Sequence, residues 1–278
     1  MTTIPREFNW RDEQGQTIYA VEWPPSGEAR AVLGLVHGLG EHCRRYDHYL
    51  AWFAEQGVAC VSYDRQGHGR SDGKRGYASD YKLYVDEIAR LVRECGTRYP
   101  SRPIFLYGHS MGGQLTLRYL VRRNPRIAGV IISAPHIRLP TAPNPLKVRI
   151  GRWLRRWKPD VALANGLDKQ FLSRDADVVV RYEADSLVHD RLSARTGIDM
   201  LENAALLNRF AGKVEVPLLI MHGQDDRITS ANGSRDFVER VSGPVTYQEW
   251  PGLYHELHNE PEWTTVAEFV LGWIEERL

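Results

Sequence analysis

The sequence predicts an α/β fold with a mostly parallel central sheet flanked by helices. Short apolar runs rich in β-branched and aromatic residues recur along the chain, and amphipathic, charge-bearing stretches separate them. Strands that alternate with helices are typical of a parallel sheet covered on both faces. In such sheets the reactive groups gather in loops at the carboxyl ends of the strands.

The predicted elements follow one another in a regular order with one interruption. The strands are expected at 17–23, 31–37, 58–64, 104–107, 128–133, 217–222 and 245–250, and helical stretches at 46–56, 81–98, 234–240 and 262–278. Between about 137 and 210 the alternation stops. That stretch opens with the proline-rich RLPTAPNP and holds helical patterns but no convincing strand. We interpret 137–210 as an inserted helical cap, or lid, over the carboxyl edge of the sheet, and 1–136 with 211–278 as the core.

Composition limits the class of protein. At 278 residues the chain can bury one substantial core, and its 36 Lys and Arg nearly balance 35 Asp and Glu, so no nucleic-acid partner is expected. Cys43, Cys60 and Cys95 cannot all pair and lack metal-ligand spacing, which favours reduced thiols. Residues 1–10 do not resemble a secretion signal, and no apolar stretch is long enough to span a bilayer. The expected location is cytoplasmic, at most peripheral to a membrane.

The segment IFLYGHSMGGQ (104–114) predicts a nucleophile. An apolar run stops at Gly108 and a helix-compatible stretch follows Ser110 directly, so Ser110 is expected on a sharp strand-to-helix turn. Glycines flank the serine because a Cβ would clash in so tight a turn. The following helix directs unpaired amides and its positive end toward a developing anion. Ser110 is therefore the expected nucleophile of a serine hydrolase.

A serine nucleophile needs a histidine to take its proton and a carboxylate to hold that histidine. Both should follow later strands. HGQDDRIT offers Asp225 and Asp226, and the pattern alone does not choose between them; the other one is expected to be a solvated turn acid or a helix N-cap. WPGLYHELHNE offers His255 and His258. The HExxH zinc motif needs histidines four residues apart rather than three, so no metal and no cofactor are expected.

An oxyanion hole needs two backbone N–H groups, one after the nucleophile and one from the loop after an earlier strand. Met111 provides the first. The turn HGLGEH is expected to provide the second at Leu39, because Gly38 and Gly40 let the backbone turn inward. His37 precedes the acid and lies in this turn, so we expect it to shape the loop rather than act as the base.

With these groups in this order, the chain resembles the monoacylglycerol lipase and lysophospholipase branch of the α/β-hydrolases. The resemblance covers almost the whole chain, including the predicted cap. The motifs that carry it are HGLGEHCRRY, YDRQGHGRSDG, GHSMGG, LDKQFLSRDADVVVRYEADSLVH, HGQDDRI and GLYHELHNE.

The resemblance assigns residues that the pattern leaves open. In the family's G-x-x-D pattern the acid falls at Asp226, and the base falls at His255. The resemblance also implies a polar pocket for a glycerol leaving group, although a buried ion pair that shapes the loop explains the same residues nearly as well. That pocket would comprise Glu41, Arg45 and His258.

Two further positions, Leu39 and His68, are compared with the corresponding positions of the family. Leu39 stands where relatives often have a smaller residue, so a narrower acyl path is expected. His68 in YDRQGHGRSDG invites a catalytic interpretation, and the glycines around it resemble a phosphate cradle. No GK[ST] sequence follows, and the corresponding loop of the family is structural, so a structural role is expected for His68.

The stretch LKVRIGRWLRRWK (146–158) predicts a basic amphipathic helix in the cap. Two compatible interpretations remain. The helix touches anionic lipid at a membrane surface, or it is a lid helix whose apolar face roofs the pocket while its cations are solvated. A calmodulin-like partner also fits the pattern. The predicted apolar face comprises Leu146, Ile150, Trp153, Leu154 and Trp157.

The sequence therefore predicts a hydrolase that cleaves lipid esters, above all monoacylglycerols, through an acyl-enzyme on Ser110. The enzymes that share this triad and remain as alternatives are a short-chain carboxylesterase, a thioesterase and an S33-like peptidase. Haloalkane dehalogenases and epoxide hydrolases carry aspartate at the nucleophile position, which argues against both. A catalytically inactive ligand receptor is the alternative from another class, and the presence of all three triad residues argues against it.

Overall fold

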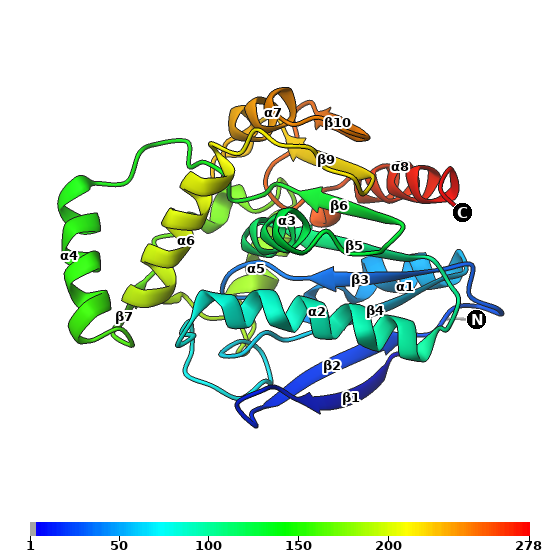
Figure 1. Ribbon diagram of the computed structural model, residues 1–278, viewed down its shortest axis with the longest axis horizontal. Helices are drawn as coiled ribbons and strands as arrows, with labels where there is room; N and C mark the ends of the chain where they lie inside the picture. The colour runs from blue at the N-terminus through cyan, green and yellow to red at the C-terminus, as the bar shows by residue number, and fades with distance from the viewer. Residues whose placement is uncertain (1–3) are drawn as a thin grey trace.

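The computed structural model describes residues 4–278 and contains an eight-stranded sheet with helices on both faces (Figure 1). The strand order is β1-β2-β4-β3-β5-β6-β9-β10; β1, β2 and β4 pair antiparallel, and all pairs from β4 to β10 are parallel. The predicted α/β fold is confirmed. The strands are β1 (Arg6–Arg11), β2 (Thr17–Trp23), β3 (Ala31–Val36), β4 (Val58–Tyr63), β5 (Ile104–His109), β6 (Gly129–Ser133), β9 (Leu218–Gly223) and β10 (Val245–Trp250).

Helices cover both faces of the sheet because its strands alternate apolar side chains between two cores. In β3, Leu33 and Leu35 pack on the side of α1 and α8, whereas Val32 and Val36 pack on the side of α2, α3 and α7. The helices are α1 (Asp47–Glu55), α2 (Tyr81–Arg98), α3 (Met111–Arg123), α7 (Ala231–Arg240) and α8 (Trp263–Glu275), with short 3-10 helices η1 (Cys43–Tyr46) and η3 (Leu257–Asn259).

The strand register brings the loops that carry the predicted site to one edge. Gly108 near the end of β5 pairs with Val36 at the end of β3, and His109 pairs with Ser133 at the end of β6. Ser133 in turn pairs with Met221 of β9. The chain segments that follow β3, β5, β6 and β9 therefore emerge side by side.

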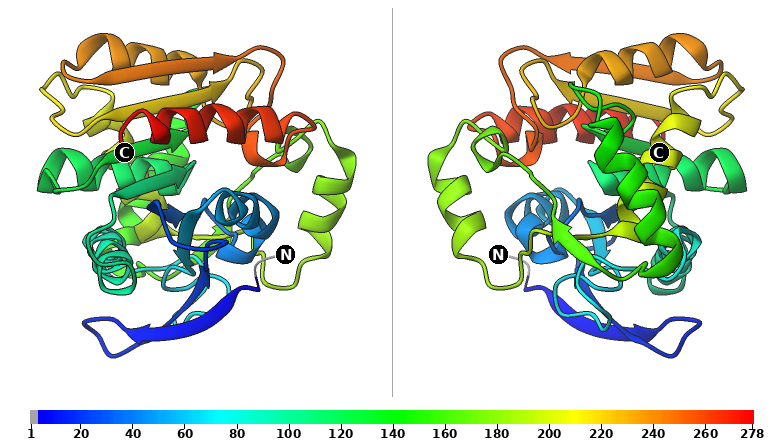
Figure 2. Two further views of the ribbon diagram at one scale, coloured as in Figure 1. Left: turned by 90° about the vertical axis from the view of Figure 1, so that its right-hand side faces the viewer. Right: turned by 90° about the vertical axis from the view of Figure 1, so that its left-hand side faces the viewer.

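The segment 137–210 runs between β6 and β9 and lies beyond this edge of the sheet (Figures 1 and 2). Its helix α4 packs along α6. It also contains a two-stranded antiparallel ribbon, which the sequence did not predict because strands of three residues are too short to show a period of two. The elements are α4 (Pro145–Trp157), β7 (Ala162–Ala164), η2 (Lys169–Phe171), α5 (Ala176–Ala184), β8 (Arg191–Ser193) and α6 (Ala194–Leu207).

The terminal strand β1 was missed by the sequence analysis. It pairs antiparallel with β2 at the edge of the sheet, and most of its side chains stay exposed. Phe8 and Trp10 alternate with polar residues, so the period-two signal was present but short. The first three residues of the 1–10 stretch lie outside the described residues. Within 4–278, no helix has both the length and the apolar character needed to cross a membrane.

Candidate active site

Ser110 lies between β5 and α3 in a backbone conformation that side chains rarely adopt. Its φ is 54° and its ψ is −117°. The Ser110 N–H donates to Ser133 O at 3.0 Å, and Ser110 O accepts from the N–H groups of Gln114 at 3.0 Å and His136 at 3.1 Å. A Cβ on the flanking Gly112 would collide with the backbone at the end of β3. Such strain, on the order of 1–3 kcal/mol, persists only where the surroundings impose it.

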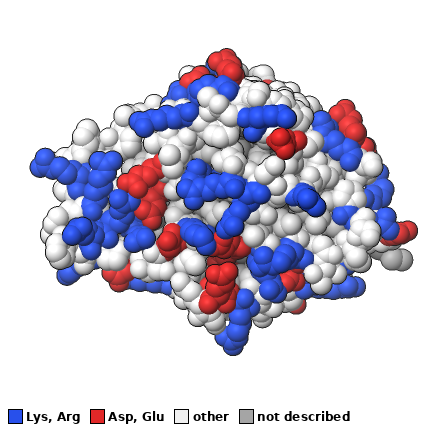
Figure 3. All heavy atoms as spheres, in the orientation of Figure 1, with Lys and Arg blue, Asp and Glu red and all other residues white. Residues whose placement is uncertain are grey.

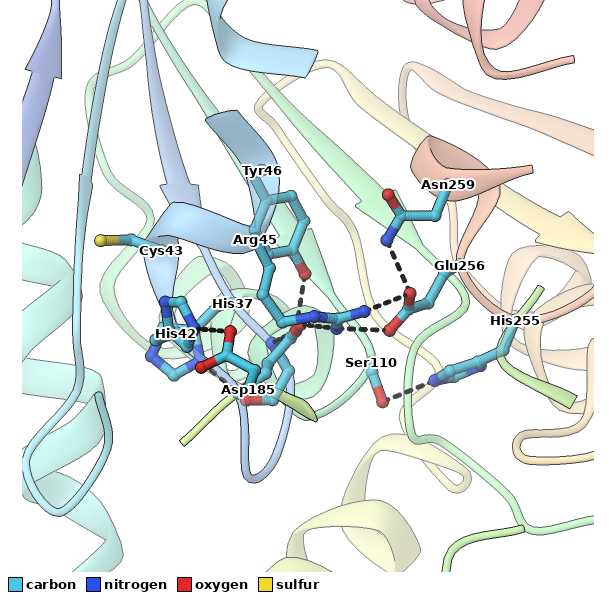
Figure 4. Close-up of polar contacts among 12 residues, drawn as sticks. His37, His42, Cys43, Arg45, Tyr46, Ser110, Asp185, His255, Glu256 and Asn259 are labelled. Carbon is cyan, nitrogen blue, oxygen red and sulfur yellow. Dashed lines mark hydrogen bonds and ion pairs between the residues drawn. The ribbon is translucent and has the colours of Figure 1, made fainter. Parts of the chain in front are cut away.

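Ser110, His255 and Asp226 form a hydrogen-bonded chain. His255 Nε2 lies 3.0 Å from Ser110 Oγ, and His255 Nδ1 lies 2.7 Å from Asp226 Oδ2 (Figure 4 shows the first of these contacts). Burial alone would lower the pKa of His255, but the neighbouring Asp226 carboxylate raises it above its ordinary value. This arrangement matches that of a general base that is oriented by a carboxylate.

The Asp226 carboxylate is almost completely buried but fully hydrogen-bonded. Its Oδ1 accepts from the N–H groups of Ile228 at 2.7 Å and Thr229 at 3.0 Å. Its Oδ2 accepts from His255, from His222 Nε2 at 3.0 Å and from the Thr229 hydroxyl at 2.8 Å. Burial alone would raise the pKa of Asp226, but His255 and His222 hold it well below its usual range. Asp226 is therefore ionised at neutral pH.

The structure distinguishes the two members of each residue pair between which the sequence pattern could not choose. Asp225 is exposed, whereas Asp226 is buried beside His255. The ring of His258 stacks on Tyr46 with centroids 4.3 Å apart, and neither of its nitrogens has a partner among the described residues. Burial lowers the pKa of His258 to about 3, so its ring is neutral. Of these two histidines, only His255 has a ring nitrogen within hydrogen-bond distance of the Ser110 hydroxyl.

The turn after β3 lies close to Ser110, since a Cβ added to Gly38 would lie 3.4 Å from the Ser110 Cβ. Leu39 and Met111 line the same cavity as Ser110, and no hydrogen bond from either N–H is found within residues 4–278. The buried Arg65 side chain donates to the carbonyl oxygens of His37 and Gly38, and the Arg65 N–H donates to His37 Nε2 at 3.1 Å. Burial keeps the pKa of His37 far below its ordinary value. His37 is thus a neutral part of the loop, as expected.

A buried ion network joins this turn to the loop that carries His255 (Figure 4). Arg45 makes two hydrogen bonds to Glu256, at 2.7 and 2.8 Å, and a further one to Glu41. Tyr46 OH donates to Glu41 at 2.7 Å, and Asn259 donates to Glu256 at 2.7 Å. Burial alone would raise the pKa of Glu256, but Arg45 lowers it strongly. Of the three predicted polar-pocket residues, only Glu41 lines the cavity beside Ser110, since Arg45 and His258 lie behind it.

The cavity beside Ser110 has a volume of about 500 Å³ and a mostly apolar wall. Its polar lining includes Glu41, Glu256, His109 and His136. The sequence analysis named only the first of these four. His109 ends β5 directly before Ser110, and His136 lies three residues beyond the end of β6, so the rule that reactive groups follow strand ends could have found both. The apolar part of the wall comes largely from the segment 137–210, with Leu139, Val148, Leu163, Ile198, Met200 and Leu201 among its residues.

The predicted amphipathic helix is present as α4, but its apolar face points outward. Asn144 caps its N-terminus and Pro145 opens its first turn. Val148 and Gly151 line the cavity, and Leu154 is half buried. The interpretation that the predicted apolar face roofs the pocket is therefore wrong: none of its five residues lines the cavity, and four of them point outward, because α6 packs against a different side of α4. Those four, Leu146, Ile150, Trp153 and Trp157, are 49–65% exposed.

Comparison with known proteins agrees with this geometry. The family described as serine aminopeptidase, S33, matches residues 27–262. A monoacylglycerol lipase of Mycolicibacterium smegmatis is 35% identical over 92% of this chain and 92% of its own length. The chain belongs to the monoacylglycerol lipase branch of the α/β-hydrolases. This α/β-hydrolase is therefore a carboxylic ester hydrolase.

Two further comparisons bear on its extent and fold. The crystal structure of a monoacylglycerol lipase from Paleococcus ferrophilus superposes on this α/β-hydrolase with a TM-score of 0.85 and 33% identity, covering 94% of this chain and 99% of the other. An abhydrolase domain-containing protein of Dictyostelium discoideum is 34% identical over 95% of this chain, which spans 28% of that protein's length. The resemblance inferred from the sequence motifs is confirmed.

Proposed function

We propose that the protein hydrolyses monoacylglycerols to a fatty acid and glycerol through an acyl-enzyme on Ser110. The observation that carries the proposal is the chain of contacts from Ser110 through His255 to Asp226, in the wall of a cavity that combines apolar and carboxylate linings. An apolar wall suits an acyl chain, and a carboxylate accepts hydrogen bonds from free hydroxyl groups of glycerol.

The proposed mechanism uses each group in turn. His255 Nε2 takes the proton from Ser110 Oγ as the oxygen attacks the ester carbonyl, and Asp226 stabilises the imidazolium that forms. The N–H groups of Leu39 and Met111 donate to the oxyanion. The imidazolium then protonates the leaving glycerol oxygen. Water, deprotonated by His255, attacks the acyl-enzyme in the same way and releases the fatty acid.

The leaving group is proposed to meet the Glu41 side of the cavity. Glu41 lines the wall, whereas Arg45 fixes the carboxylates of Glu41 and Glu256. His258 packs behind them against Tyr46. In this proposal Glu41 contacts glycerol, while Arg45 and His258 hold the polar pocket in shape. Leu39 also lines the cavity, where its side chain would narrow the path of the acyl chain.

The segment 137–210 is proposed to act as a cap on a core formed by 1–136 and 211–278. Most apolar lining residues of the cavity come from it, so it would set the fit of the acyl chain. Contacts that attach it to the core beside the site include His42 Nε2 at 2.8 Å from Asp185 Oδ2, the His189 N–H donating to Gly40 O at 2.8 Å, and Arg45 over the Tyr182 ring.

The outward face of α4 is proposed to touch an anionic membrane surface. Figure 3 shows Lys and Arg side chains at the left end of the molecule, where Figure 1 places α4. An exposed apolar stripe flanked by cations is typical of an interfacial helix. With buried, free cysteines, these features support a cytoplasmic enzyme in peripheral contact with lipid. The flanking cations are Lys147, Arg149, Arg152 and Arg156.

A substrate panel tests the proposed function. It compares monoacylglycerols of graded acyl length with p-nitrophenyl esters, acyl-CoAs and aminoacyl amides. The expected result is the highest kcat/KM on monoacylglycerols. A preference for aminoacyl amides or acyl-CoAs would contradict the proposal, and the absence of fluorophosphonate labelling at Ser110 would contradict the acyl-enzyme.

A further inference from the structure

The proposed mechanism makes no use of His136, a nearly buried histidine in the wall of the active-site cavity. His136 follows the end of β6, and its backbone N–H donates to Ser110 O at 3.1 Å. Its ring lines the cavity together with Ser110. A single backbone hydrogen bond therefore holds the residue that carries this ring beside Ser110.

Contacts made by Gln114 determine which nitrogen of this ring carries the proton. Gln114 Nε2 lies 2.7 Å from His136 O and 3.0 Å from Met200 O, while Tyr81 OH donates to Gln114 Oε1. Two carbonyl oxygens around Nε2 require that atom to be the amide nitrogen. It also lies 3.0 Å from His136 Nδ1. A proton on Nδ1 would face the amide hydrogens, so Nδ1 accepts, sharing one of the two amide hydrogens with His136 O, and the ring proton lies on Nε2.

The His136 Nε2–H group is left without a partner. No described residue in 4–278 accepts a hydrogen bond from it. Burial lowers the pKa of His136 to about 4, so the ring is neutral and keeps a single N–H. Nearby parts of the cavity wall are apolar, with Leu139, Val148 and Leu201 among their residues. Nε2 is not among the enclosed, unpartnered polar atoms of the described residues, so this donor reaches the accessible wall, where an acceptor on a bound ligand can pair with it.

We propose that His136 is a specificity-determining residue that donates a hydrogen bond to an oxygen on the acyl chain close to the ester carbonyl. Esters of 2- or 3-hydroxyacyl chains carry such an oxygen, and unsubstituted chains do not. The short connection between His136 and Ser110 places the donor near the start of the chain rather than at its far end. This inference rests on the proposed role of Ser110 as the acyl-accepting nucleophile.

Gln114 serves as the positioning residue for this donor. Its amide fixes the ring tautomer and also binds the carbonyl of Met200 in α6, so one side chain aligns His136 with the acyl wall. A residue such as leucine at position 136 would fill the same wall without a donor. The preference for hydroxyacyl esters over unsubstituted esters is therefore expected to depend on His136 and Gln114 together rather than on cavity size alone.

The test compares kcat/KM for glycerol esters of dodecanoic acid and of its 2-, 3- and 12-hydroxy derivatives. For the wild type, the ratio of the 2- or 3-hydroxy ester to the plain ester is expected to exceed that of His136→Leu about three- to tenfold, the effect of one hydrogen bond between neutral groups. The 12-hydroxy ester should show no such dependence on residue 136. His136→Gln, which retains an N–H donor, should recover part of the ratio.

Matched variants separate the donor from packing. Leu201→Ala enlarges the same wall and should leave the ratio unchanged, whereas Gln114→Met should lower it mainly through KM. Equal ratios in the wild type and His136→Leu would overturn the inference. If His136→Leu fails to fold, equal rates of the wild type on all three hydroxy esters would overturn it as well. Failure of the wild type to cleave any of the esters, or cleavage by Ser110→Ala, would instead contradict the proposed function.

Discussion

His222 Nε2 lies 3.0 Å from the same Asp226 oxygen that receives the hydrogen bond of His255. The other ring nitrogen of His222 lies 2.8 Å from the Ser234 hydroxyl, so the ring is fixed from both sides. Asp226 thus has a buried donor that competes with His255 for its charge. The strength with which Asp226 holds His255 depends on this second histidine.

Replacement of His222 by leucine is expected to lower kcat about tenfold, the effect of a lost hydrogen bond to a charged group. Without that donor the Asp226 carboxylate becomes more basic, which raises the pKa of His255 further. The acidic limb of the kcat/KM profile should move to higher pH. Ser234→Ala, which leaves the bond to Asp226 in place, should change kcat less than about threefold. An unchanged profile for His222→Leu would show that His222 only fills space.

Replacement of Ser110, the proposed nucleophile, tests the proposed acyl-enzyme directly. Ser110→Ala is expected to lower kcat by about 10⁶, by analogy with triad removal in a serine protease. Labelling by a fluorophosphonate should disappear as well. Ser133→Ala removes another buried hydroxyl close by without touching His255 and should keep both properties. Hydrolysis by Ser110→Ala within tenfold of the wild type would contradict the assignment.

The pH dependence follows from the directions of two pKa shifts. His255 must be neutral to act as a base, and its pKa is raised, so kcat/KM should fall below a pKa that lies above about 6.5. Asp226→Asn removes the charge that raises this pKa. The His255 ring should then titrate at lower pH in an NMR titration, and kcat should fall about 10⁴-fold because the tautomer is no longer held.

The shifted pKa values of His255 and Asp226 also make the free energy of unfolding depend on pH. Because the pKa of His255 is raised by folding, this residue stabilises the folded state below about pH 6.5, and that stability is lost as the pH rises through the pKa of His255 in the folded protein. Because the pKa of Asp226 is lowered by folding, this residue stabilises the folded state above about pH 4, and that stability is lost on acidification. The free energy of unfolding of the wild type should exceed that of Asp226→Asn most between about pH 4 and 6.5. A difference that grows above that range would contradict the assigned shifts.

The sequence was informative wherever a residue's role follows from its place at a strand end. Ser110 and the two alternative pairs at 225–226 and 255–258 were located in this way, because parallel strands bring their carboxyl ends together. The choice of Asp226 and His255 within those pairs came from resemblance. Burial explains why spacing could not decide: one aspartate faces His255 and its neighbour faces water.

Contacts between distant segments were beyond the sequence. Nothing near Arg45 in the chain indicates that its guanidinium reaches Glu256, 211 residues later. The amphipathic pattern of α4 predicted its apolar stripe but not that the stripe faces outward, because orientation depends on how α6 packs. Gln114 looks like an ordinary helix residue until the structure shows what its amide binds.

The exposed stripe of α4 is expected to bind vesicles that contain anionic lipid. A double replacement, Trp153→Ser with Trp157→Ser, removes two large apolar side chains and should weaken partitioning about tenfold or more. Hydrolysis of a soluble p-nitrophenyl ester should persist, since neither tryptophan lines the cavity. Val180→Ser on α5 removes a similarly exposed apolar group as a control. Co-sedimentation that is equal for all three proteins would exclude α4 as the contact.

The buried Arg45 should contribute to stability far more than an exposed arginine. Its removal in Arg45→Met leaves Glu41 and Glu256 as uncompensated buried carboxylates, so the free energy of unfolding should fall by about 3–5 kcal/mol. Arg30 pairs with Glu275 at 2.9 Å on the surface, and Arg30→Met should cost less than about 1 kcal/mol. Denaturation in urea measures both.

Removal of a buried negative charge tests why Arg45→Met loses stability. If uncompensated charge destabilises Arg45→Met, then Glu256→Gln added to it should recover part of the stability, because a neutral amide replaces a buried carboxylate. Lower pH should recover stability as well, since the orphaned carboxylates then take up protons. A loss from Arg45→Met that neither the second replacement nor acidification reduces would instead point to packing against Tyr182, whose ring lies 4.6 Å from the guanidinium carbon.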